Sequence, residues 1–195
     1  MTGMQQLFTE ERLEIIQSVG YPDPDFSHFR ATDIWMTASN SDQQVETGWA
    51  GRFLDHVFPG FPDGYPNTEM PDPLAIQIGS AASLTCQGPV YNMAMSVSDP
   101  TSFYNLISGS SGTVPNTNAG KELEYLRVTS QQTNAYSQQI VDAANNVSQQ
   151  YSGYPTGNRL AEQLKIVAQL IAGGLKTRIY MVSIGGFDTH AEQVE

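Results

Sequence analysis

Basic residues are scarce in this sequence of 195 residues. Only 9 lysines and arginines stand against 20 aspartates and glutamates, so the formal net charge is −11. A surface so poor in cations opposes binding to the phosphate backbone of nucleic acids or to anionic lipid. The acidity suits a protein that holds divalent cations, although solubility alone explains it as well. We therefore expect no nucleic-acid partner.

Cysteine is nearly absent too, because Cys86 is the only one. A single cysteine excludes an internal disulfide and says nothing of the redox compartment. No histidine, lysine or arginine stands beside it in "SLTCQGPV" to favour the thiolate. The sequence predicts that Cys86 is a small buried hydrophobic residue.

Several other features are missing, and each excludes a class of protein. No apolar run approaches the roughly 20 residues that span a bilayer, so no membrane-spanning segment is expected. The polar N-terminus lacks the basic region and apolar stretch of an export signal. The sequence contains no Walker loop, no G-x-G-x-x-G fingerprint and no G-x-S-x-G nucleophile elbow, which excludes the usual nucleotide sites and a defensible Ser-His-Asp triad.

What the sequence does contain is an alternation of strand and helix patterns. A loop is expected over 59–73, where five prolines prevent both helix and inner strand. A Gly/Ser/Asn-rich connection is expected at 109–120. Strands are predicted over 12–21, 74–80, 91–98 and 177–186, and helices over 27–39, 48–58, 98–109, 119–152 and 158–176.

Apolar spacing indicates which helix faces pack against other elements. The anchors expected in the first two helices are Phe29, Ile34 and Trp35, followed by Trp49, Phe53 and Val57. The stripe expected on the long helix contains Leu126, Thr133, Tyr136, Ile140, Ala144, Val147 and Tyr151, and that on the next helix contains Leu160, Leu164, Val167 and Ile171.

The order of these elements predicts an α/β fold with a mainly parallel sheet. The segment 177–186 has apolar residues at odd and at even positions, so both faces of a strand formed there would be apolar. This predicts a central strand covered by helices on both sides. We expect one domain over residues 1–195.

The stretch GGFDTH directly follows that last strand. Ligands of open α/β sheets bind outside the carboxyl ends of the strands, so polar groups there are the first site candidates. If the backbone stays extended, the side chains of Asp188 and His190 point to the same side. A carboxylate beside an imidazole suits Zn²⁺, Mn²⁺ or Fe. The alternative is structural: Thr189 and Glu192 read as a capping box that starts another helix.

A second candidate is the stretch "GYPDPDFSHF". The hydroxyl of Ser27 opens a helix, where free N–H groups favour a phosphate or sulfate; the alternative interpretation is that Ser27 is a simple N-cap. His28 is either a metal ligand, a substrate contact or a surface histidine. The spacing of these residues does not decide between the alternatives.

Four motifs in this order, "SVGYPDPDFSHFRATDIWMTAS", "GWAGRFLDH", "LAIQIGSAASL" and "IYMVSIGGFDTHAEQ", resemble the bacterial domain-of-unknown-function 1501 family. The resemblance covers nearly the whole chain. That family looks like a member of the alkaline-phosphatase-like superfamily of metal-dependent phosphatases, sulfatases and phosphomutases. The resemblance implies an α/β/α sandwich and, because many relatives are exported, a periplasmic or exported protein.

The resemblance also implies roles for single residues. Asp188 and His190 become ligands of a divalent metal, Zn or Mn, and Ser27 and His28 become candidates for nucleophile or substrate contact. The implied substrate is a small phosphate or sulfate ester.

The sequence also departs from the family pattern. An upstream strand ending in a Gly-Gly-x-Asp segment and a downstream Asp-His pair are absent, so we expect 1–195 to be an incomplete domain that is inactive by itself. The alternative expectation is a non-catalytic, exported surface or binding protein on the same scaffold, with the Gln/Asn/Ser-rich helix and the Pro-rich loop as its interaction surface.

Overall fold

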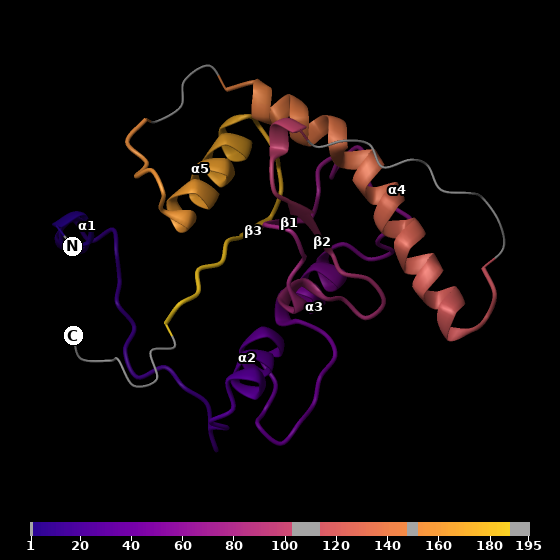
Figure 1. Ribbon diagram of the computed structural model, residues 1–195, viewed down its shortest axis with the longest axis horizontal. Helices are drawn as coiled ribbons and strands as arrows, with labels where there is room; N and C mark the ends of the chain where they lie inside the picture. Colours follow the sequence, from indigo (N-terminus) through magenta and orange to yellow (C-terminus); the bar gives the residue numbers. More distant parts are fainter. Residues whose placement is uncertain (1, 103–113, 148–151, 188–195) are drawn as a thin grey trace. The chain divides into compact units, whose positions relative to one another are not determined.

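A computed structural model describes residues 2–102, 114–147 and 152–187. The chain divides into two compact units, Met1–Val45 and Glu46–Glu195. Helices and strands occur together, and the strands form a small parallel sheet, which confirms the α/β class (Figure 1). In the described residues, no helix combines the length and the apolar character needed to cross a membrane.

The first unit contains two helices, α1 (Thr2–Thr9) and α2 (His28–Thr37). The helix α2 was predicted, and it ends at Ala38, which adopts a left-handed conformation with φ 51°. The Arg30 side chain then holds the following loop by donating to the backbone oxygens of Asn40, Ser41 and Gln43. Among the predicted apolar anchors only Ile34 is buried, whereas Phe29 and Trp35 are exposed.

The strand predicted over 12–21 is wrong, because this segment has no regular secondary structure. Its apolar side chains Ile15, Ile16 and Val19 are all exposed. Ser18 has φ 58°, which an extended strand does not allow. An apolar pattern alone does not make a strand, because a strand needs a partner strand to satisfy its backbone groups.

The second unit is organised around a sheet whose strands, over the described residues, have the order β2-β1-β3. The central strand β1 (Ala75–Ile78) pairs in parallel with β2 (Ala94–Val97) and with β3 (Ile179–Met181). This confirms the strands predicted around 74–80 and 91–98. The prediction that 177–186 forms a central strand is wrong for the described sheet, where β3 lies at an edge and is half-buried.

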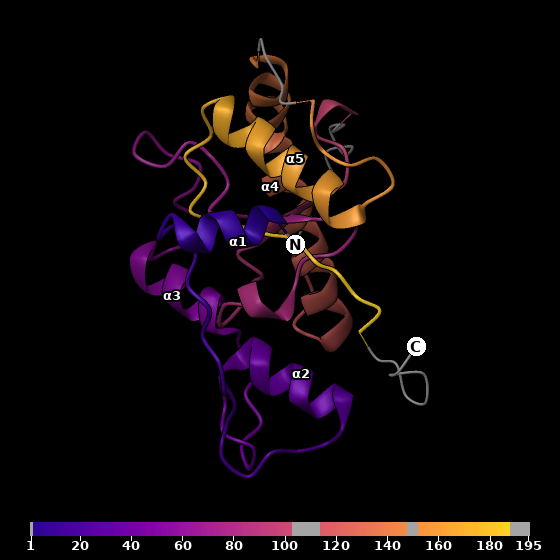
Figure 2. The ribbon, with the colours of Figure 1, turned by 90° about the vertical axis from the view of Figure 1, so that its left-hand side faces the viewer.

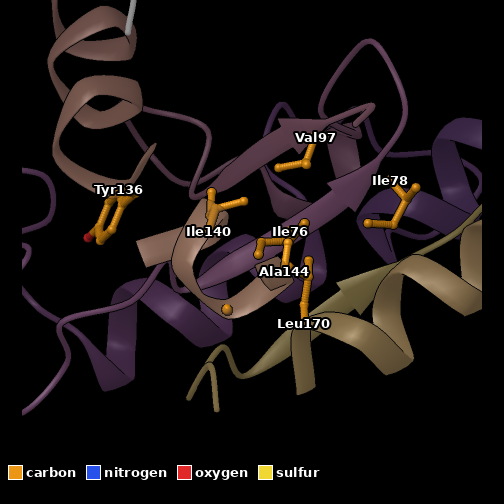
Figure 3. Close-up of a cluster of buried hydrophobic side chains, with 8 residues drawn as sticks. Ile76, Ile78, Val97, Tyr136, Ile140, Ala144 and Leu170 are labelled. Carbon is orange, nitrogen blue, oxygen red and sulfur yellow. The ribbon is translucent and has the colours of Figure 1, made fainter. Parts of the chain in front are cut away.

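Two apolar clusters pack against the two faces of β1. Ile76 and Ile78 belong to one cluster, and Ala75 belongs to the other, as expected from the alternation of side chains along a strand. Figure 3 shows the first cluster, in which side chains from α4 and α5 meet the strands. Its buried members are Ile76, Ile78, Val97, Tyr136, Ile140, Ala143, Ala144 and Leu170. The buried members of the second cluster are Ala50, Leu54, Met70, Leu74, Ala75, Cys86 and Met93.

The two long helices of this unit are α4 (Asn118–Asn145) and α5 (Arg159–Ala172). They lie side by side near their C-terminal ends (Figure 2), where Gln169 Nε2 donates to the backbone oxygen of Ala144 over 2.7 Å. Both helices were predicted, but α4 ends at Asn145 and not near 152, because two asparagines in succession favour a helix end.

The predicted helix stripes are correct only in part. Tyr136, Ile140 and Ala144 of α4 are buried as expected, whereas Leu126 is exposed. In α5 the buried residue is Leu170, while the predicted Leu164 and Ile171 are exposed. Tyr151 lies outside the described residues.

Short 3₁₀ turns connect the strands to their neighbours. One turn, η1 (Leu84–Cys86), lies between β1 and β2, and another, η2 (Pro100–Ser102), follows β2. The second turn occupies the start of the helix predicted over 98–109, and the rest of that prediction lies largely outside the described residues. The segment 59–73 contains neither helix nor strand, as its prolines predicted.

The helix α3 (Trp49–Val57) packs against the core with a different face from the one predicted. Trp49, Phe53 and Val57 are exposed, and the buried residues are the small Ala50 and Gly51 together with Leu54. The small residues allow close packing of α3 against Gln87, the residue after η1. A Cβ on Gly51 would lie only 2.2 Å from the Gln87 backbone oxygen. The large aromatic side chains do not fit on this face.

The close approach of α3 predicts the effect of adding one methyl group. Alanine favours a helix over glycine by about 1 kcal/mol, but at Gly51 its Cβ collides with the backbone of Gln87. We expect Gly51→Ala to lower the free energy of unfolding by about 2 kcal/mol, measured by thermal unfolding followed by circular dichroism. The matched control is Gly3→Ala in α1, where a Cβ meets nothing within 4 Å. Equal stability of both variants contradicts the close approach.

Candidate functional site

A cavity of about 440 Å³ lies at the carboxyl ends of the strands. Because β1, β2 and β3 are parallel, their carboxyl ends meet at one edge of the sheet, which is the usual ligand position in open α/β sheets. We call this space the carboxyl-end cavity. Its walls come from the end of β1, from the first turns of α5 and from residues just after β2 and β3, and they are Gln77, Ile78, Gly79, Ser80, Ala81, Ser98, Arg159, Glu162, Gln163, Ile166 and Ser183.

Hydrogen bonds fix the backbone at the end of β1. The Gly79 amide donates to Val97 O over 3.1 Å, which continues the pairing with β2. The Gly79 oxygen accepts from the hydroxyls of Ser96 and Ser98 at 2.9 and 3.0 Å. Gly79 has φ 146°, a conformation that favours glycine, and so the chain leaves the sheet here.

Gln77 is the most deeply buried polar side chain of the cavity wall, at 4% exposure. Its Nε2 donates to Ser183 Oγ over 3.4 Å. Its Oε1 is buried and has no hydrogen-bond partner among the described residues. A buried acceptor without a donor is unfavourable, so Oε1 is available to a ligand that carries an N–H, an O–H or a cation.

The side chain of Gln163 on α5 binds the backbone of Ser183, which lies two positions after the end of β3. The Ser183 amide donates to Gln163 Oε1 over 2.9 Å, and Gln163 Nε2 donates to the Ser183 oxygen over 2.7 Å. One side chain thus satisfies both backbone groups of Ser183. This pair fixes the start of the segment that leads to GGFDTH against the first turns of α5.

Among the described residues that line the cavity, Arg159 and Glu162 carry charges of opposite sign. Arg159 is the first residue of α5, it is exposed, and no ion pair among the described residues involves its guanidinium. Glu162 Oε1 accepts from the amide of Gly157 over 3.3 Å, which directs part of this carboxylate to the loop before α5. The amide groups at the start of α5 add partial positive charge. The guanidinium and the helix start therefore favour an anionic group at this end of the cavity.

The predicted metal ligands Asp188 and His190 lie outside the described residues, so their pairing stays a prediction. The described chain reaches Phe187, and it turns at Gly186, which has φ 90°. This left-handed conformation accounts for one of the two glycines of GGFDTH. Within residues 2–102, 114–147 and 152–187, no group of three or more His, Cys, Asp or Glu side chains is placed to hold a metal ion.

Ser27 and His28 belong to the first unit. Ser27 is the N-cap of α2, because its Oγ accepts from the Arg30 amide at 3.4 Å, and its own amide donates to Asp25 Oδ1 over 2.7 Å. His28 is the first residue of α2 and is exposed. The capping role of Ser27 is thus observed, and the catalytic roles of both residues stay predictions.

Gln77, Arg159 and Gln163 were not predicted as site residues. One signal in the sequence points to Gln77, which is a polar residue within the apolar run "LAIQIG" of a fully buried strand. The sequence gives no such signal for Gln163. Glutamine is common on helix surfaces, and its partner is the backbone of Ser183, 20 residues further along the chain.

Cys86 is buried, as predicted, and its Sγ lies 3.3 Å from Met181 Sδ. Burial raises the pKa of the Cys86 thiol to about 11, so the uncharged form persists at neutral pH. A nucleophilic role for this cysteine is therefore not supported.

Comparison of the chain with protein-family models, with curated proteins and with solved structures gave no match. The resemblance to the domain-of-unknown-function 1501 family therefore rests on the four motifs alone and stays a prediction.

The burial of Cys86 predicts slow alkylation. The pKa of about 11 lies well above an assay pH of 8.5, so little thiolate forms in the folded chain. We expect its reaction with iodoacetamide at pH 8.5 to be on the order of 100-fold slower than in the urea-unfolded chain, as measured by mass spectrometry. A second cysteine introduced by Ser152→Cys at an exposed position is the positive control and reacts rapidly. Equal rates for both cysteines contradict the burial of Cys86.

Proposed function

We propose that this chain is part of a metal-dependent hydrolase that cleaves small phosphate or sulfate esters with water. The observation that supports the proposal most is the carboxyl-end cavity, since Ser183 in the segment after β3 lines it and this segment leads along the sequence into GGFDTH. The proposed scaffold is an alkaline-phosphatase-like α/β/α sandwich. The apolar clusters on the two faces of β1 are consistent with such a layered arrangement.

The described residues supply groups that suit an anionic ester. Arg159 offers a guanidinium that pairs well with phosphate or sulfate oxygens. The Ser183 hydroxyl accepts from Gln77, so its own hydrogen is available to donate. These groups would orient the ester at the strand ends.

The proposed metal is Zn or Mn, held by the Asp188 carboxylate and the His190 imidazole. Among the described residues, Gln77 Oε1 is buried without a hydrogen-bond partner, and it would be an oxygen group of the kind that such a metal accepts as a ligand. When bound, the metal supplies fixed positive charge that polarises the ester oxygens and activates a nucleophile. Further ligands are needed, because two do not complete a site.

The proposed roles of Ser27 and His28 are nucleophile or substrate contact. A hydroxyl at the start of a helix lies among amide groups that favour an anion, which is the environment in which Ser27 is found. By the same family resemblance, we propose a periplasmic or exported location for the protein.

The alternative function is a non-catalytic surface or binding protein on the same scaffold. Its supporting observation is the exposed apolar stripe on α3 formed by Trp49, Phe53 and Val57. Such a stripe is typical of a helix face that contacts another surface. The two experiments below distinguish this alternative from the enzyme.

The metal proposal predicts selective loss of binding. We expect calorimetric titration of the chain with Zn²⁺ or Mn²⁺ to give affinities about tenfold or more weaker for Asp188→Ala and His190→Ala, because each variant loses a ligand. The matched controls are Asp63→Ala and His56→Ala, which alter exposed residues of the same types. If all five proteins bind metal equally weakly, the metal site is wrong.

The enzyme proposal predicts hydrolysis that depends on Ser27 but not on its capping role. The product of the complete coding sequence is assayed with 4-nitrophenyl phosphate and 4-nitrophenyl sulfate. Asparagine also caps helices, so Ser27→Asn keeps thermal stability, and we expect it to lower kcat on the order of 100-fold. A fully active Ser27→Asn variant contradicts the catalytic role. Complete inactivity of the metal-loaded wild type favours the binding protein.

A further inference from the structure

A second cavity, of about 370 Å³, lies between α4 and the β2 side of the sheet. We call it the α4 cavity. Its helical wall follows one face of α4, because the lining positions recur at spacings of three and four residues. These positions are Tyr125, Val128, Thr129, Gln132, Thr133 and Tyr136.

In the described part of the chain, two polar atoms that line the α4 cavity lack hydrogen-bond partners. The hydroxyl of Tyr136, a residue at 1% exposure, and the Oε1 of Gln132 are both buried and have no hydrogen-bond partner among the described residues. Figure 3 shows the Tyr136 hydroxyl pointing away from the other labelled side chains of its cluster. The two residues are four positions apart on α4 and therefore lie on the same face. A buried polar atom is normally satisfied, so this pair indicates a missing partner.

The remaining walls favour an uncharged ring. Phe61, Tyr91 and Tyr125 contribute aromatic rings, and Met93 and Met95 contribute thioethers, which pack well against aromatic ligands. Within the part of the chain that the structure describes, no residue that lines the cavity is charged. Burial raises the pKa of Tyr91, and the Glu124 and Asp63 carboxylates raise it further. These two carboxylates would repel an anionic ligand.

The two polar atoms define the hydrogen bonds of the ligand. Gln132 Oε1 accepts only, so the ligand needs a donor. Burial raises the pKa of the Tyr136 phenol, with a smaller contribution from Asp72, and its hydroxyl therefore keeps its hydrogen at neutral pH. A phenolic hydroxyl can donate to one of these atoms and accept from the other.

We propose that the α4 cavity is a binding site for an uncharged aromatic compound that carries a hydroxyl group. The hydroxyl binds between Gln132 Oε1 and the Tyr136 hydroxyl, and the ring lies against the aromatic and methionine walls. A cavity of this size is at the small end of ligand sites, which fits a compound of one or two rings.

Ser80 and Ala81 line both cavities, so the two sites share part of one loop. If the proposed function holds, the ring site would accept the alcohol portion of an aryl phosphate or aryl sulfate. This step alone rests on the proposed function. Binding of the free phenol to the α4 cavity does not require hydrolysis, so the failure of one does not imply the failure of the other.

The test uses 4-fluorophenol as the probe, with the 195-residue chain at pH 7 and ¹⁹F NMR as the readout. We expect binding of 4-fluorophenol to be about fivefold or more tighter than binding of fluorobenzene, which lacks the hydroxyl. Tyr136→Phe removes only a hydroxyl that has no hydrogen-bond partner among the described residues, so this variant should fold and show a reduced preference. Thr133→Phe fills the cavity and should abolish binding. The control Tyr21→Phe, outside the cavity, should bind as wild type.

Several outcomes would overturn the site. One is equal affinity for 4-fluorophenol and fluorobenzene, and another is the absence of probe binding. A third is a Tyr136→Phe variant that unfolds at the wild-type temperature and keeps the full preference for 4-fluorophenol over fluorobenzene. Binding of methyl β-glucopyranoside but not of 4-fluorophenol would also overturn it, since the ring would then not be aromatic.

Discussion

The burial of β1 on both faces is the constraint on which the second unit depends. All four residues of this strand are buried, and each face is covered by its own apolar cluster. Burying apolar side chains contributes roughly 25 cal/mol per Å², so the two clusters stabilise the unit from opposite sides of one short strand. Because β2 and β3 pair in parallel with β1, the same strand also determines where their carboxyl ends meet. The cavity at that edge is a direct result of the core.

The two cavities differ in chemistry because they use different parts of the same framework. The carboxyl-end cavity lies where strands end and a helix begins, so backbone groups, serines and charged residues line it. The α4 cavity lies alongside a helix and β2, so side chains line it, and those of the described residues are all uncharged. Each cavity has at least one buried polar atom that finds no partner in the described part of the chain, Gln77 Oε1 in the first and Gln132 Oε1 in the second. This shared property distinguishes both from ordinary packing defects, which are apolar.

The sequence predicted local features well where the chain itself determines them. Prolines excluded regular structure from 59–73, the serine before α2 capped that helix, and the apolar run of β1 formed a buried strand. Predictions failed where distant parts of the chain decide. On α3, apolar spacing pointed to Trp49 and Phe53, but the approach of the Gln87 backbone selects the face with Gly51. The position of β3 at an edge likewise depends on which strands pair, and the period of apolar residues does not contain this information.

The exposed tryptophans of α2 and α3 determine how the protein responds in fluorescence measurements. The chain has two tryptophans, Trp35 and Trp49, and they are 74% and 48% exposed. Their emission therefore reports on the surrounding water in the folded state and should shift little to the red when the core is disrupted. A surface that covers them would move the emission to the blue. Intrinsic fluorescence is thus a poor indicator of unfolding in this protein and a sensitive indicator of what touches these two side chains.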